Sequence, residues 1–286
     1  LRSGSRTRLR SAAKRRNQPQ ISHIRKTPDT LTNLSQDLTH VTHPAEDGVE
    51  PGFAGAQKMR CAATKQNQKP KMKTQPKMDL YKLHKPEYAA TRKPALVELK
   101  PATYLAIAGQ GAPGGEKFTA SIGALYGVAF TIKMTRKSAG LQDYAVCRLE
   151  GQWWSEPASD FGKLPPDQWL WKLLIRTPDF IKEEDLRQAV AVLLNRCKGE
   201  DVKRVRLESL AEGLCVQMLH VGPYDKEPET IAVMKAFAEK QQLEFAGKHH
   251  EIYLSDPRRV PPERVKTILR VPCQRQAALR PTPAPN

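Results

Sequence analysis

The stretch Gly247-Lys248-His249-His250-Glu251-Ile252-Tyr253-Leu254-Ser255-Asp256-Pro257 reads as a β-strand with an acid at its centre. Side chains alternate between the two faces of a strand, so His249, Glu251 and Tyr253 share one face. The intervening residues face the other way and are typical of a core. An acid beside an aromatic ring in a cleft suits a ligand that is flat, apolar and partly cationic. An edge strand with a solvated glutamate remains the plain alternative.

Working outward from this strand, the chain shows one order of predicted elements twice. The first unit is predicted to have strands at 95–99 and 103–108, a helix at 116–137, and strands at 143–150 and 169–176. After a linking helix at 183–197, the second is predicted to have strands at 203–210 and 214–221, a helix at 227–241, and strands at 248–254 and 265–271.

Helical periodicity is clearest in the two predicted helices of the first part of the chain. The buried stripe of the 116–137 helix is predicted to be Phe118, Ile122, Leu125, Ala129 and Ile132. The stripe of the linking helix is predicted to be Leu186, Val190, Leu193 and Cys197. We therefore expect an α+β fold made of duplicated strand-helix-strand-strand units, with pseudo-twofold symmetry around a central ligand groove and the helices on one side.

Charge separates the chain into three parts. Residues 1–77 hold 16 of the 47 Lys and Arg residues but only 5 of the 30 Asp and Glu residues, so only +6 of the formal net charge of +17 remains for the rest. This segment has a single aromatic residue, Phe53, and should be a disordered basic head. Residues 78–273 form the predicted folded domain, and 274–286 a loose Pro-rich tail. An excess of +6 does not define a phosphate-binding face, so nucleic acid is not the expected partner.

Three origins remain open for residues 1–77. The Arg- and Ser-rich start is similar to a mitochondrial transit peptide, and a basic tail can contact nucleic acid. The interpretation that we favour is that the segment lies upstream of a native start at Met78, because the sequence changes character there. Mass spectrometry of the native N-terminus tests this, and a native peptide before Met72 would exclude it.

Other common classes of site lack a signal. The five cysteines show no Cys-x-x-Cys spacing, which indicates neither a disulfide framework nor zinc, and favours a reducing compartment. Adjacent His249 and His250 point to opposite faces and cannot share one metal. The Gly109-x-Gly111 pair lacks the third glycine of a dinucleotide fingerprint. We expect no metal, no cofactor and no membrane span, and a cytoplasmic protein.

Aromatic residues carry the second functional signal. All four tryptophans fall between positions 153 and 171. Trp169 and Trp171 share one strand face, and a wall of rings beside Glu251 would make a rigid cage of low dielectric constant. Glu251 could there balance a cationic ligand or act as a general base toward water. Ordinary core packing is the competing interpretation for each ring.

Several short motifs together resemble the GyrI-like small-molecule-binding family, over residues 78–273. The matching segments are Met78-Asp79-Leu80-Tyr81, Leu149-Glu150-Gly151-x-Trp153-Trp154, Trp169-x-Trp171, Ile175-Arg176-x-Pro178-Asp179-Phe180, Glu212-Gly213, His220-x-Gly222-Pro223-Tyr224 and 247–258. The resemblance implies a ligand groove on the pseudo-twofold axis. Residues 1–77 show no DNA-binding helices, so the chain resembles the stand-alone form of the family.

The resemblance also implies site residues and activities. One stand-alone branch hydrolyses cyclopropanoid DNA-alkylating antibiotics of the yatakemycin class. By strand position the family's groove acid corresponds to Glu251. The implied ligand-binding rings are those of Trp154, Trp169, Trp171, Tyr253, Tyr126 and Tyr224. We expect binding of planar hydrophobic or cationic xenobiotics with possible ring-opening hydrolysis; the alternatives are a sequestering protein without turnover, or a gyrase-interacting inhibitor, which no residue here specifically supports.

Overall fold

The computed structural model describes residues 76–156 and 161–276. The predictions for residues 1–77 and 274–286 therefore fall almost entirely outside the described residues. Two short helices come first, α2 (Leu80–Leu83) and α3 (Lys85–Tyr88). The first unit then has β1 (Ala95–Leu99), β2 (Ala102–Gln110), α4 (Glu116–Ser138), β3 (Glu150–Trp154), the 3₁₀ turns η2 (Phe161–Lys163) and η3 (Pro166–Gln168), and β4 (Leu170–Arg176).

The linking helix α5 (Glu183–Asn195) and a 3₁₀ turn, η4 (Glu200–Arg204), lead to the second unit. This unit contains β5 (Arg206–Leu210), β6 (Gly213–Val221), η5 (Tyr224–Lys226), α6 (Glu227–Lys240), β7 (Leu243–Phe245), β8 (His249–Tyr253), η6 (Pro262–Arg264) and β9 (Lys266–Arg275).

One antiparallel sheet runs through both units in the order β1-β6-β9-β8-β3-β4-β2-β5, and β7 pairs with β9 at the side. By their order in the two units, β1 corresponds to β5, β2 to β6, β3 to β8 and β4 to β9. When each strand is replaced by its counterpart, the strand order reads in reverse, as a pseudo-twofold relation requires. The predicted α+β class and duplicated element order are thus confirmed. The first strand of each unit pairs with a strand of the other unit, so the two halves share one sheet.

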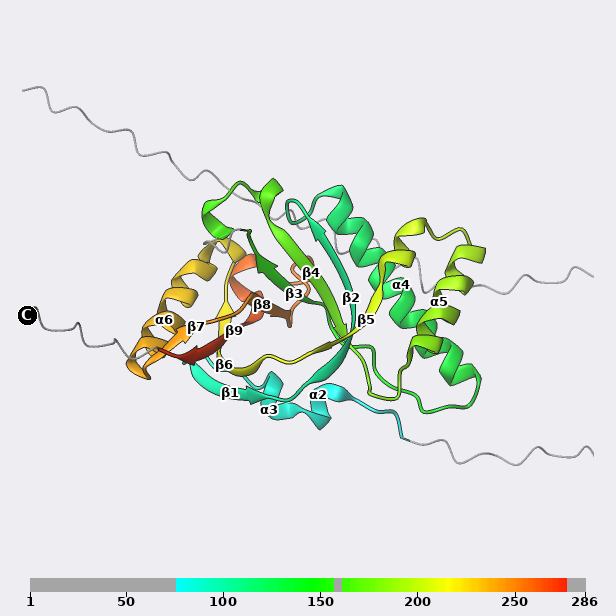
Figure 1. Cartoon of the computed structure of the whole chain (residues 1–286), viewed down its shortest axis with the longest axis horizontal. Helices are drawn as coiled ribbons and strands as arrows, with labels where there is room; N and C mark the ends of the chain where they lie inside the picture. Colours follow the sequence, from blue (N-terminus) through cyan, green and yellow to red (C-terminus); the bar gives the residue numbers. More distant parts are fainter. Residues whose placement is uncertain (1–75, 157–160, 277–286) are drawn as a thin grey trace, which may run out of the picture.

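The long helices cover one face of the sheet, with α4 and α5 at one end and α6 at the other (Figure 1). The larger core lies between the sheet and α4 and α5, and all five predicted stripe residues of α4 are buried in it. A second core lies under α6, around Val216, Met234 and Leu269. The central strands β3 and β8 pass between these two cores.

The opposite face of the sheet meets the short helix α3, whereas Leu80 of α2 is buried in the larger core. The side chains of Glu87 and Tyr88 in α3 hydrogen-bond Arg176 of β4, which faces away from the long helices. The expectation that helices lie on one side therefore holds for the long helices but not for this segment. No periodic pattern predicted α2 and α3, because each helix has only four residues.

The structure corrects several boundaries. The predicted strand at 143–150 is wrong: of residues 143–149 only Tyr144 forms a bridge, with Met78, and the strand is Glu150–Trp154. The linking helix ends at Asn195, and Cys197 has a positive φ of 52°, which ends the predicted stripe before that residue. The last strand continues to Arg275 because β7, which was not predicted, pairs with it.

Candidate functional site

Glu251 lies at the centre of the sheet, on the face that carries the long helices. In the β3–β8 register it stands opposite Gly151, and His249 stands opposite Trp153. Residues opposite each other in a ladder share a face, so these four positions point between α4 and α6. Glu251 as a whole residue is 1% exposed. The alternative of an edge strand with a solvated glutamate is therefore wrong.

A second acid joins Glu251 from a distant part of the chain. Glu227, the first residue of α6, is buried beside His249 and Glu251, and one ligand atom of each of the three lies within 4.8 Å of the others. The Nε2 atom of His249 lies 3.4 Å from Oε1 of Glu251. Two buried carboxylates and an imidazole thus meet in one small volume.

A chain of hydrogen bonds positions the Glu251 carboxylate. The indole N–H of Trp153 donates to the hydroxyl of Tyr253 over 3.3 Å, and that hydroxyl donates to Glu251. Burial and the nearby Glu251 raise the pKa of Tyr253 well above its usual value, so the phenol keeps its proton and remains a donor. The orientation of the acid is therefore fixed from the β3 side.

Tyr224, in the turn before α6, completes this side of the cluster. Its ring centroid lies 6.3 Å from that of Tyr253, nearly perpendicular to it. Burial raises the pKa of Tyr224 far above its usual range, and the charges of Glu251 and Glu227 raise it further. Both acids of the cluster therefore lie close enough to Tyr224 to act on its hydroxyl.

Glycine at position 151 makes room for the hydrogen-bond chain. A Cβ atom there would lie 2.9 Å from the Tyr253 hydroxyl oxygen and 3.2 Å from Nε1 of Trp153. The absence of a side chain opposite Glu251 therefore lets the tyrosine and the indole meet.

Three of the four tryptophans belong to one aromatic cluster beside these residues. The rings of Trp153 and Trp169 are 6.0 Å apart, and Phe118 of α4 contacts both Trp153 and Trp171. Trp171 is 0% exposed and packs against Gly109, where a Cβ would lie 2.3 Å from its ring. Its indole is thus surrounded by core atoms.

Trp154 is not brought together with Glu251. Since Trp153 shares the face of Glu251, Trp154 points to the other face, where the Nζ atom of Lys248 lies 3.4 Å from its ring centroid. Tyr126 lies on α4, which covers the same face of the sheet as Glu251, and it is hydrogen-bonded with the backbone of Leu149. Burial raises the pKa of Tyr126 to about 12.

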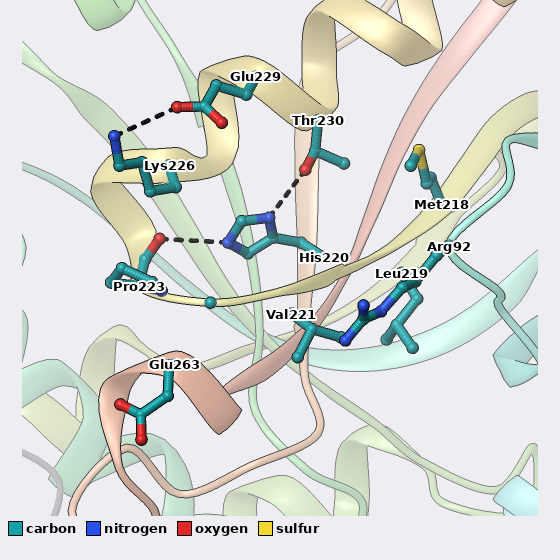
Figure 2. Close-up of a pocket in the computed structure, with 11 residues that line it drawn as sticks. Arg92, Met218, Leu219, His220, Val221, Pro223, Lys226, Glu229, Thr230 and Glu263 are labelled. Carbon is teal, nitrogen blue, oxygen red and sulfur yellow. Dashed lines mark hydrogen bonds and ion pairs between the residues drawn. The ribbon is translucent and has the colours of Figure 1, made fainter.

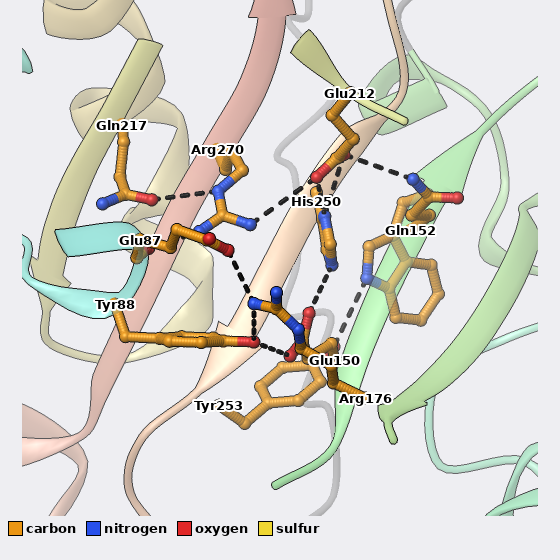
Figure 3. A network of polar contacts seen from close by, with 11 residues as sticks. Glu87, Tyr88, Glu150, Gln152, Arg176, Glu212, Gln217, His250, Tyr253 and Arg270 are labelled. Atoms are coloured by element: carbon orange, nitrogen blue, oxygen red, sulfur yellow. Dashed lines mark hydrogen bonds and ion pairs between the residues drawn. The ribbon is translucent and has the colours of Figure 1, made fainter. Parts of the chain in front are cut away.

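A different buried polar network occupies the opposite face of the same central strands (Figure 3). His250 lies between two acids, with Nδ1 2.9 Å from Glu212 and Nε2 3.2 Å from Glu150. Although burial opposes its charge, the two carboxylates raise the pKa of His250 to about 9. The pKa of Glu212 falls to about 2, because His250 and Arg270 outweigh the effect of burial.

Charges in this network balance. Its acids are Glu87, Glu150 and Glu212, and its cations are Arg176, Arg270 and protonated His250. The side chain of Tyr88 bridges Arg176 and Glu150. Glu150, in the strand of the first unit that corresponds to β8, is therefore a buried structural acid and lies on the other side of the sheet from Glu251.

A hollow of about 500 Å³ lies near the start of α6 (Figure 2). His220 lines it, with Nε2 3.2 Å from the carbonyl of Pro223 and Nδ1 2.8 Å from the Thr230 hydroxyl. Because a carbonyl only accepts hydrogen bonds, Nε2 carries the proton. Both ring nitrogens of His220 are thus used to fix the turn before α6, and the lining includes no residue of the Glu251 cluster.

Sequence reasoning did not assign Glu227 or Trp153 to the site. Glu227 was recognised only as the start of a helix, and nothing in local spacing links it to a strand that begins 22 positions later. The signal for Trp153 was available: it stands in β3 with Gly151, and alternation separates it from Trp154. The misplaced strand at 143–150 hid that alternation.

The model of the GyrI-like small-molecule-binding domain matches residues 92–274, well over half of the 286 residues. The chain belongs to the GyrI-like family. An uncharacterised conserved protein from Listeria innocua is 42% identical to this GyrI-like chain, with a TM-score of 0.66, covering 69% of this chain and all of its own. A hydrolase encoded by lin2189 from the same organism is 40% identical, with a TM-score of 0.64, covering 70% and 100%.

A further crystal structure of a hydrolase from Listeria innocua matches the GyrI-like chain at 40% identity and a TM-score of 0.63, over 69% of this chain and all of its own. No curated protein matches. Among the helices of residues 76–156 and 161–276, none has the length and apolar character needed to cross a bilayer. Expectations about the cytoplasm, residues 1–77 and DNA gyrase stay predictions.

Proposed function

We propose that this GyrI-like protein binds planar, amphipathic small molecules beside Glu251 and opens the activated cyclopropane of yatakemycin-type compounds by adding water. The observation that carries the proposal is the convergence of Glu227, His249 and Glu251 next to hydrogen-bonded Tyr253 and Trp153. The similarity to Listeria proteins described as hydrolases supports the catalytic part.

The binding step follows from the surroundings of the cluster. Flat rings gain from contact with Tyr224, Tyr253, Trp153 and Trp169, which lie near the acids or near one another. The two carboxylates favour a ligand with a positive or polarisable edge. Of the rings predicted from the sequence, Trp169, Tyr224 and Tyr253 are proposed as contacts and Tyr126 as a neighbour. Trp171 is proposed to support them from the core.

The chemical step needs a base and a held water molecule. Glu251 accepts a proton from water as the water oxygen bonds to a cyclopropane carbon. One cyclopropane C–C bond breaks, and its electron pair passes into the conjugated carbonyl of the substrate, giving a phenolate. That phenolate takes up the proton, so the product is the substrate plus one water. The donated hydrogen bond from Tyr253 keeps the carboxylate in position during the attack.

Glu227 alters the balance between turnover and plain binding. Sequestration without turnover would be favoured if no second acid lay beside Glu251. The structure places Glu227 within 4.8 Å of the cluster's other ligand atoms. A second carboxylate can hold the attacking water or the cationic edge of the ligand from the α6 side, which favours the catalytic proposal.

The test is turnover of a yatakemycin-type substrate in the presence of a chelator, followed by mass spectrometry for a product 18 Da heavier, the mass of water. We expect turnover by the wild type and a rate lower by roughly 10²–10⁴-fold in Glu251→Gln, the usual contribution of a general base. The matched control is Glu229→Gln, two residues after Glu227 on α6 and paired with Lys226 at the surface. If Glu251→Gln and Glu229→Gln both bind the substrate and both leave it intact, the catalytic proposal is wrong.

Sequestration without turnover is the second candidate, and the same negative, aromatic surroundings favour it. It predicts saturable binding of one planar cationic dye per chain, measured by fluorescence, with no change in the mass of the ligand. Inhibition of gyrase stays a prediction from the resemblance alone, and its measurement is co-purification with the topoisomerase.

A further inference from the structure

The Glu227–His249–Glu251 cluster combines residue types that an organic ligand does not require. Each of the three residues is more than nine-tenths buried, with exposures of 5%, 8% and 1%. A flat cation could be held by one carboxylate and a ring. An imidazole aligned with two carboxylates is instead a typical donor set for divalent transition metals.

We propose that Glu227, His249 and Glu251 bind a divalent transition-metal ion of the zinc class. Zinc binds imidazole nitrogen and carboxylate oxygen at about 2.0–2.2 Å, so donors around a tetrahedral ion are roughly 3.4 Å apart. The donor atoms here lie within 4.8 Å of one another, and His249 and Glu251 already within 3.4 Å. The widest separation must shorten by at most about 1.4 Å, which side-chain rotations can supply.

The backbone supports this geometry. His249 and Glu251 are two positions apart on β8, so their side chains are neighbours on one face, while His250 between them points to the other. Glu227 approaches from the start of α6, a 14-residue helix packed on the same sheet. The three donors therefore come from two rigid elements, which is how binding sites keep their shape.

Charge also favours a divalent ion. Two carboxylates buried together repel each other, and a cation shared between them lowers that repulsion. A divalent ion would balance the two carboxylates, while a neutral His249 supplies the third donor.

His250 provides the contrast within the same strand. It also contacts two acids, but through opposite ring nitrogens, so the carboxylates of Glu150 and Glu212 lie on different sides of its ring. Arg270 also pairs with Glu212, and Arg176 of the same network pairs with Glu87. That network is neutral and its donors do not converge, so it is not expected to bind metal.

An ion in the cluster would occupy the carboxylate that the proposed hydrolysis uses as a base. Metal binding is therefore measured on its own, by calorimetric titration of chelator-treated, dialysed full-length protein with zinc chloride. Cobalt(II) gives a second reading, since its visible absorption reports the coordination geometry. We expect one high-affinity ion per chain, with the visible bands of a four- or five-coordinate cobalt site.

The variants are His249→Gln and Glu227→Gln, with Glu229→Gln as the control on the same helix. Each of the first two should lower zinc affinity by at least tenfold and abolish the cobalt bands, whereas the control should bind like the wild type. All three retain the histidines and cysteines outside the cluster, so ions bound elsewhere would persist in every variant. A wild type that binds no zinc, or that binds it no more tightly than His249→Gln, would overturn the proposal.

Failure of a variant to fold does not decide the matter, because the wild-type titration alone can refute metal binding. Failure of the metal proposal is also distinct from failure of the hydrolysis proposal, since turnover is assayed in chelator.

Discussion

Trp153 donates its indole N–H to the hydroxyl of Tyr253 over 3.3 Å, joining the two central strands across the middle of the sheet. The contact is possible because the residue opposite Glu251 is glycine. It connects the aromatic cluster under α4 to the acid that we propose as a base. The first prediction tests this contact.

Substitution of Gly151 by alanine should disturb the site directly. The new methyl group would lie 2.9 Å from the Tyr253 hydroxyl, so the tyrosine must move and its hydrogen bond to Trp153 must lengthen. Overpacking of this kind costs about 1–3 kcal/mol in the free energy of unfolding, measured in urea. Dye affinity should fall as well. The control is Gly127→Ala on α4, where the nearest side-chain atom is 3.7 Å away and helix propensity should favour alanine.

The second prediction concerns pH and the network around His250. Its pKa is raised from 6.5 to about 9, so its contribution to stability is complete below pH 6.5 and disappears as the pH rises through 9. Glu212 behaves in the opposite sense: its pKa is lowered from 4.5 to about 2, so its contribution is present above pH 4.5 and disappears as the pH falls through 2.

Stability from this pair should therefore be greatest between about pH 4.5 and 6.5 and should fall toward pH 9.5. Urea unfolding at pH 6.0 and 9.5 measures the fall, and proton NMR should locate the titration of His250 near pH 9. His250→Gln should lose most of this dependence. An imidazole signal that titrates near pH 6.5 would contradict the prediction.

Glu87 should matter for stability although it precedes the region matched by the family model. Its carboxylate lies 2.6 Å from Nη1 of the buried Arg176, whose side chain is only 5% exposed. Glu87→Gln should cost about 1.5–3 kcal/mol, typical of a hydrogen bond to a charged group. Glu184→Gln breaks a pair of mostly exposed side chains, Glu184 and Arg187, and should leave the unfolding midpoint unchanged.

Substitutions of Trp171 and Tyr253 should distinguish a role in core packing from a role in the ligand site. Trp171 is fully buried against Gly109 and Phe118, so Trp171→Phe should lower stability by about 1–3 kcal/mol and leave the dye affinity of folded protein unchanged. Tyr253→Phe removes the hydroxyl that holds Glu251, so it should lower turnover more than stability. A large loss of affinity in Trp171→Phe would return this ring to the ligand-binding set.

Prediction from the sequence succeeded where a local pattern was long enough. The 23-residue helix α4 was recognised from its stripe, and its start was placed at Glu116, as observed. Prediction failed at 143–150, where apolar residues lie against the core without the ladder partners of a strand. It also missed β7, because three residues are too few to show alternation and are held by pairing with β9.

For the site, the sequence predicted Glu251 from its place in a short strand and the tryptophans from their density. It could not choose among the tryptophans, because the side chain that meets Tyr253 depends on which strand lies next to β8 and in which register. The observed register puts Trp153 on the face of Glu251, and a shift of one residue would have put Trp154 there instead.

The sequence by itself determined the α+β class, the repeated order of elements, the family and which residues of the strand share a face with Glu251. These properties depend on periodicity and on motifs within a few residues, which the chain carries locally. Only the tertiary structure decided that Glu227 meets His249 and Glu251, and that His250 belongs to a separate neutral network. Such contacts depend on how a helix end and two strands of different units pack, and packing is a property of the whole fold.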